Sequence, residues 1–142
     1  MVTNEIIPGV RIGKFYIGEN VDILKKKLSG RVDIEKGSQS IVLKTENMSF
    51  WIDKRTNKVF QIGVTNNFKG KFLDRIGLGS TLLDVQKSIG EWEEEFDVYI
   101  LPKYPGICFE LKDIDDYEEE WNESEMPINA IYIYDQNYFD EK

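Results

Sequence analysis

The chain has 142 residues, of which 41% are hydrophobic and 13% aromatic, with three tryptophans, one cysteine and no histidine. This composition fits one folded domain and excludes an intramolecular disulfide, histidine-ligated metals and catalysis by Ser-His-Asp or Cys-His pairs. No apolar run approaches the roughly 18 residues that span a bilayer, and residues 1–5 do not begin a secretory signal. We therefore expect a cytoplasmic protein that is not an enzyme.

Charge is distributed unevenly along the chain. Residues 1–90 contain 15 basic and 9 acidic side chains, a net charge of +6, whereas residues 91–142 contain 3 basic and 17 acidic side chains, a net charge of −14. An acidic half repels nucleic-acid phosphates and attracts a basic protein surface. The charge pattern therefore predicts a protein partner, and neither a nucleic-acid nor a membrane partner.

Two short segments of the chain repeat at an offset of 61 residues. Apolar residues with the i, i+3, i+7 spacing of an amphipathic helix occur in both, at Val21, Leu24 and Leu28 and at Leu82, Val85 and Ile89. Asn20 precedes the first segment as an N-cap, and Ser80 or Thr81 precedes the second. Gly30 and Gly90 follow as C-terminal stops. The pattern predicts two helices of two to three turns.

Strand patterns follow each predicted helix. In the first half they cover residues 32–35, 40–44, 48–52 and 59–64, with a polar hairpin loop at 53–58; in the second half they cover residues 96–101, 106–111 and 128–134. We predict an α+β protein with two tandem units, each a short helix packed on an antiparallel β-sheet. Residues 1–142 would form a single domain made of two repeats, at about residues 10–66 and 70–134.

The second repeat carries a resemblance to known families. The residues Leu78-Gly79-Ser80, Val85 and Ile89-Gly90, followed by a strand meander, resemble the repeat of the β-lactamase-inhibitory-protein and outer-membrane-assembly lipoprotein superfamily. This resemblance covers about residues 10–134 and implies a short helical segment on an antiparallel sheet. The segment 60–134 is also similar to immunity proteins encoded beside bacterial polymorphic toxins, through residues 60–62, 70–72, 76–81, 104–111 and 127–128. That similarity implies neutralisation of a toxin domain by binding.

The candidate binding segment is residues 113–125, which hold eight carboxylates and no basic residue. Relative to the first repeat, eight extra residues precede the last strand, and they fall within this segment. Aromatic side chains are favoured anchors in protein interfaces, and carboxylates steer a basic partner. We predict that the partner-binding residues are Asp113, Asp115, Asp116, Tyr117, Glu118, Glu119, Glu120, Trp121 and Glu123. The alternative, a solvated acidic loop that only aids solubility, remains open.

Other motifs favour ordinary structural roles. The acidic segment does not match a calcium-binding loop, because its sixth position from Asp113 is Glu118 and not glycine. The acidic run 91–97 alternates as the exposed face of a strand does. Cys108 lies in an apolar strand pattern on the same face as Glu110, and we expect it to have no chemistry. The run Lys25-Lys26-Lys27 is typical of a solvated helix face.

The resemblance, together with the acidic charge, implies a cytoplasmic immunity protein that occludes a cognate toxin domain, for which we expect a basic nuclease. Carboxylates of residues 113–125 would take the place of the phosphates of the toxin's substrate. The alternative is an inhibitory-protein-like binding module, or an assembly factor, with another protein target. We expect a monomer without a cofactor and without a metal ion.

Overall fold

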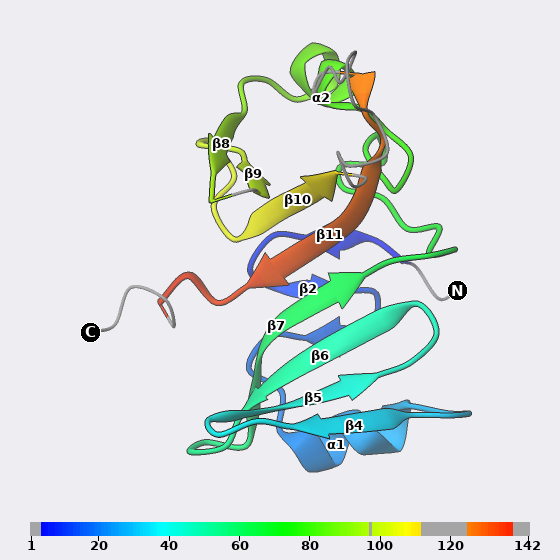
Figure 1. Cartoon of the computed structure of the whole chain (residues 1–142), viewed down its shortest axis with the longest axis vertical. Helices are drawn as coiled ribbons and strands as arrows, with labels where there is room; N and C mark the ends of the chain where they lie inside the picture. The colour runs from blue at the N-terminus through cyan, green and yellow to red at the C-terminus, as the bar shows by residue number, and fades with distance from the viewer. Residues whose placement is uncertain (1–3, 97, 112–124, 138–142) are drawn as a thin grey trace.

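The computed structural model describes residues 4–96, 98–111 and 125–137. These ranges contain eleven strands and two helices (Figure 1). The strands are β1 (Ile6–Ile7), β2 (Arg11–Ile12), β3 (Phe15–Tyr16), β4 (Asp33–Lys36), β5 (Ser40–Lys44), β6 (Met48–Asp53), β7 (Lys58–Val64), β8 (Glu93–Glu95), β9 (Val98–Ile100), β10 (Ile107–Leu111) and β11 (Ile128–Tyr134). The helices are α1 (Val21–Lys27) and α2 (Leu82–Ser88). Among the described residues, neither helix is long and apolar enough to cross a membrane.

One antiparallel sheet of eight strands dominates the fold. Its strand order is β4-β5-β6-β7-β11-β10-β9-β8, so the two halves of the chain meet where β7 pairs with β11. Figure 1 shows the sheet running from β4 beside α1 at one end, through β7 and β11, to β8 and β9 near α2. The described strands of the acidic half, β8 to β11, therefore lie on one side of the β7–β11 junction, and β4 to β7 of the basic half lie on the other.

The predicted α+β class with two helix-on-sheet units is wrong, since the structure is mostly β. A seven-residue helix is too short to cover a sheet of its own. The pairing of β7 with β11 joins the strands of both predicted units into one sheet of eight. A second sheet, β1-β2-β3, supplies cover that the prediction had assigned to the helices.

The N-terminal sheet lies outside the predicted elements. Its strands have two residues each, which is too short for an alternation pattern to be visible in the sequence. Ile6 and Ile12 are buried in the main hydrophobic core. The Gly9 amide donates to the Gly106 carbonyl at 3.1 Å. A Cβ atom on Gly106 would lie only 2.8 Å from the Gly9 nitrogen, so glycine at 106 permits this close approach.

Both predicted helices and their N-caps are confirmed. The Asn20 side chain accepts a hydrogen bond from the Asp22 amide at 2.8 Å. Thr81 and Asp84 form a capping box, in which each side chain accepts from the backbone amide of the other residue. The predicted apolar stripes also face the core: Leu24, Leu82 and Val85 are fully buried, and Val21, Leu28 and Ile89 are partly buried against the same cluster.

The core occupies one face of the eight-stranded sheet. Residues that pair directly across antiparallel strands point to the same face. Phe50 pairs with Ile62, Ile62 with Ile133 and Ile133 with Ile107, and all four side chains are fully buried. Residues at the alternate positions of these strands therefore point to the opposite face, where the candidate site lies.

Candidate functional site

The opposite side of the large sheet carries a continuous row of side chains, which we call the open face. Strand register aligns one residue from each of the eight strands, and a second row runs beside the first on β4 to β7 and β11. The first row is Asp33, Lys44, Ser49, Gly63, Tyr132, Cys108, Ile100 and Glu93; the second row is Glu35, Val42, Trp51, Gln61 and Tyr134.

An aromatic pair stands at the centre of the open face. The rings of Trp51 and Tyr132 meet edge to face, with centroids 5.9 Å apart and planes at 69°. Between them lies Gly63, where an added Cβ would be 2.7 Å from two carbons of the Tyr132 ring and 3.3 Å from the Trp51 ring. Glycine in the interior of β7 thus makes room for the pair. Both aromatic side chains are half-buried, so each keeps part of its ring surface in contact with solvent.

Tyr132 is held as a neutral hydrogen-bond donor. Its hydroxyl donates to Glu110 Oε1 at 3.4 Å, which is a long hydrogen bond. Burial, followed by the negative charge of Glu110, raises the pKa of Tyr132 to about 12. The same two causes raise the pKa of the neighbouring Cys108 thiol to about 12. The thiol is therefore protonated at neutral pH, which argues against a nucleophilic role.

The open face carries a surplus of negative charge. By strand register, six carboxylates point to this side, against two ammonium groups. The ammonium groups are those of Lys44, which is paired with Glu35 at 2.9 Å, and of Lys58. These eight residues leave a net charge of −4 on the face. The six carboxylates are those of Asp33, Glu35, Asp53, Glu93, Glu95 and Glu110. An apolar, aromatic centre with an acidic border is the complement of a basic protein surface.

The binding segment predicted from the sequence lies outside the described residues. This applies to Asp113, Asp115, Asp116, Tyr117, Glu118, Glu119, Glu120, Trp121 and Glu123. Glu125, the last carboxylate of the acidic segment, is described and is exposed. The structure therefore does not test whether the predicted binding residues lie together.

Sequence reasoning missed the open face because its central pair joins residues far apart in the chain. Two local signals were present. Trp51 alternates with the apolar Phe50 and Ile52, which puts a large aromatic side chain on the polar side of β6. Gly63 interrupts a largely apolar strand, and such a glycine marks a close approach.

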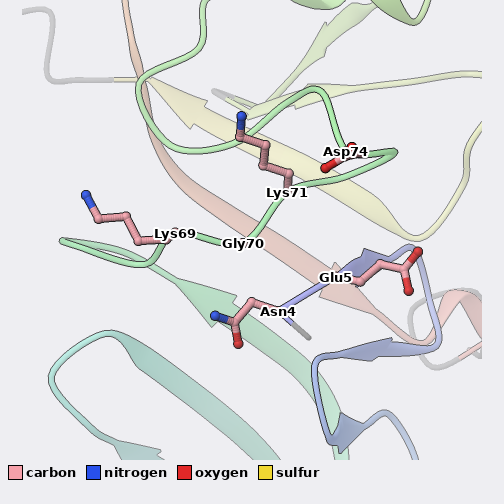
Figure 2. Close-up of a pocket in the computed structure, with 6 residues that line it drawn as sticks. All are labelled: Asn4, Glu5, Lys69, Gly70, Lys71 and Asp74. Atoms are coloured by element: carbon pink, nitrogen blue, oxygen red, sulfur yellow. The ribbon is translucent and has the colours of Figure 1, made fainter. Parts of the chain in front are cut away.

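Two surface pockets do not form convergent sites. The first, of about 560 Å³, is lined by Asn4, Glu5, Lys69, Gly70, Lys71 and Asp74. Figure 2 shows the ammonium groups of Lys69 and Lys71 pointing to one side and the Glu5 carboxylate to the other, so these charged ends do not meet. The second, of about 670 Å³, lies near the Arg31–Asp33 ion pair. Within the described ranges, no cluster of three metal-binding side chains occurs.

Comparisons with known proteins show a similar fold but indicate no activity. No protein-family model matches the chain, and no curated protein matches it. The uncharacterized protein yfeY from Escherichia coli is similar in structure, with a TM-score of 0.54 and 11% sequence identity over 94% of this chain and 98% of that one. A cysteine-rich secretory protein (SAV1118) from Staphylococcus aureus matches with a TM-score of 0.48 and 11% identity, over 99% of this chain and 53% of that one. At such identity, the likeness to yfeY shows a shared fold alone.

Proposed function

We propose that the protein is a non-enzymatic immunity protein that binds and neutralises a cognate toxin domain through the open face. The observation that carries this proposal is the Trp51–Tyr132 pair, which remains half-exposed at the centre of an acidic sheet face. The proposal places the protein in the cytoplasm, where it would meet its toxin, and gives it no catalytic role.

The aromatic pair supports protein binding on energetic grounds. Tryptophan and tyrosine dominate interface hot spots, because a rigid ring removes much apolar surface from water when a partner covers it. The pair stands on the central strands β6 and β11, each of which has a neighbour on both sides. A surface of this kind is preorganised, so little conformational entropy is lost on binding.

The charge of the open face supports a cationic partner. A nuclease domain must present basic groups to the phosphates of its substrate, and the carboxylates around the aromatic pair offer those groups an alternative ligand. In this mechanism, Trp51 and Tyr132 fill the apolar part of the contact while Glu110 and its neighbours face the toxin's lysines and arginines. The predicted binding segment 113–125 holds eight further carboxylates that could bind a cationic partner.

The test is binding kinetics with a candidate toxin domain, namely the C-terminal domain of any large secreted protein encoded beside the gene. We expect Trp51→Ala to weaken binding by at least about 30-fold, the equivalent of about 2 kcal/mol, mainly through faster dissociation. The matched control is Tyr16→Ala, which removes an exposed aromatic side chain on β3, outside the large sheet. Thermal melts of both variants check folding. An affinity unchanged by Trp51→Ala would overturn the role of the open face.

A growth assay separates immunity from other kinds of binding. Co-expression of the wild-type protein should restore growth to cells that make the toxin domain, and the Trp51→Ala variant should not. If the wild-type protein fails to protect but binds a different protein through Trp51, the alternative function, a binding module with another target, replaces immunity.

A further inference from the structure

A second apolar group stands far from the open-face centre, at the turn between β8 and β9. Phe96 is 94% exposed, whereas the other exposed large hydrophobic side chains of the described residues reach 52% at most. Its backbone has φ of +51°, a left-handed conformation that glycine or asparagine adopts far more readily than a bulky aromatic residue. Neither packing nor turn geometry therefore accounts for phenylalanine at this position.

The hairpin that carries Phe96 is held firmly at its base. Glu93 pairs with Ile100, Glu94 with Tyr99 and Glu95 with Val98. The Trp92 ring packs edge to face on Tyr99 at 5.6 Å, and Tyr99 belongs to the buried core. The exposed ring of Phe96 is thus presented on a fixed support, which lowers the entropic cost of inserting it into a partner.

Four exposed glutamates lie just before Phe96 in the chain. Glu91, Glu93, Glu94 and Glu95 are all exposed, and none of the four forms an ion pair with another of the described residues. Residues 91–102 include no lysine and no arginine. Such a surface repels anionic lipid headgroups and nucleic acid, and it attracts a cationic protein.

We infer that the β8–β9 hairpin is a docking element that inserts Phe96 into an apolar pocket on a cationic protein, with the flanking glutamates facing basic groups at the pocket's rim. The inference goes beyond the open face, because it concerns the outer edge of the sheet and requires a cationic partner of any function. β8 is the last strand of the sheet, so a partner can approach the hairpin without displacing a described strand.

The first experiment replaces Phe96 by a photoreactive phenylalanine in cells of the native host and identifies the cross-linked protein. The control position is Ile34, which is exposed on β4 at the opposite edge of the sheet. We expect one basic protein to be captured at position 96 and not at position 34. Capture should fall at least fivefold when Glu93, Glu94 and Glu95 are all changed to glutamine. An absent adduct, an adduct with a second copy of the chain, or an adduct with an acidic protein would each overturn the inference.

The second experiment measures dissociation of the purified captured protein. Phe96→Ser should speed dissociation at least tenfold, Phe96→Tyr should stay within about twofold of the wild type, and Leu83→Ser, at an exposed site on α2, should change nothing. Equal dissociation rates for Phe96→Ser and the wild type would sink the docking role.

The outcomes also separate this inference from immunity. A captured protein that is not a toxin domain keeps the hairpin's role, and the proposed function is then decided by the Trp51→Ala kinetics and the growth assay alone. A toxin domain that is released by Trp51→Ala but not by Phe96→Ser keeps the function and removes the hairpin's role.

Discussion

At the scale of single residues, Phe96 combines an unfavourable backbone conformation with an exposed ring. Left-handed geometry costs an L-residue roughly 1–2 kcal/mol, a cost that glycine avoids, although glycine also gives the unfolded chain more freedom. We therefore predict that Phe96→Gly raises the free energy of unfolding by up to about 1 kcal/mol in denaturant titration. A fall of more than about 0.5 kcal/mol would show that the ring stabilises the fold, and that its exposure needs no functional explanation.

The buried thiol of Cys108 makes the free energy of unfolding depend on pH in the alkaline range. Burial, then the charge of Glu110, raises the pKa of its thiol from an ordinary value of 9.0 to about 12. Between these two values the unfolded chain loses the proton and the folded chain keeps it, so the free energy of unfolding falls as pH rises from 9 to 12. We predict that Cys108→Ala flattens this fall in denaturant titrations at pH 8 to 11. Parallel pH profiles for the variant and the wild type would contradict the assignment, and Tyr132, whose pKa is also raised, would carry the remaining slope.

Gly63 is tested by its contacts with the aromatic pair. An alanine methyl group would overlap the Tyr132 ring at 2.7 Å, so Gly63→Ala should cost about 1–3 kcal/mol of stability through overpacking. In a protein that already carries Tyr132→Ala, adding Gly63→Ala should cost far less stability, because the overlapping ring is gone. Chemical denaturation of the four proteins of this double-mutant cycle measures the coupling. A coupling near zero would mean that the pair does not require glycine.

At the scale of elements, the two helices depend on their buried stripe. Leu24→Ala in α1 and Leu82→Ala in α2 should each cost about 2–5 kcal/mol, because both side chains are fully buried. The matched controls are Ile23→Ala and Leu83→Ala on the exposed sides of the same helices, which should stay within about 0.5 kcal/mol. Thermal or denaturant unfolding checks all four variants. Similar losses at the buried and exposed positions would contradict the packing described above.

Elements with local signals could be predicted from the sequence. Both helices follow from their apolar spacing, and Asn20 and Thr81 follow from the needs of a helix N-terminus. Most strands of the large sheet appear where alternation predicts them, with ends displaced by a residue or two. The alternation of the acidic run 91–97 indicates the exposed face of a strand, and β8 confirms a strand within it. The pattern at 96–101, by contrast, missed the turn at Phe96, and the strand there begins only at Val98.

The pairing of elements could not be predicted from local patterns. The register that places Tyr132 beside Gly63 joins residues from different halves of the chain, and no short-range pattern encodes it. The same limit explains the wrong fold class, since the merging of the strands into one sheet depends on β7 and β11 alone. The candidate site could not be predicted for the same reason. A charge run such as 113–125 can be recognised in the sequence, whereas an aromatic pair that forms across three strands cannot.

At the scale of the whole molecule, the strand order separates the described strands of the two halves of the chain. Residues 1–90 have a net charge of +6 in sequence and residues 91–142 a net charge of −14, and the strands of these two halves occupy opposite ends of the large sheet. If the acidic end steers a cationic partner, the association rate should fall at least tenfold between 0.1 M and 1 M salt, because the Debye length shrinks from about 10 Å to about 3 Å.

Stopped-flow or surface-based kinetics with the toxin domain measures this salt dependence. As a control, Lys25→Gln and Lys26→Gln alter charge on α1, beside the first-half end of the sheet, and should leave the association rate within about twofold. An association rate that stays flat across this range of salt would show that long-range steering plays no part in binding.

The pairing of β7 with β11 also has a consequence for folding during synthesis on the ribosome. When β7 has been synthesised, residues 65–127 must still be added before β11 begins, which takes about 3–13 s at typical elongation rates. During that interval the strand is paired with β6 on one side only, and its other edge of amide and carbonyl groups is bare. The nascent chain therefore passes through a period in which a seven-residue, largely apolar strand is open to wrong partners. Chains that terminate early within that stretch would keep this edge permanently, as substrates for chaperones or as seeds of aggregation.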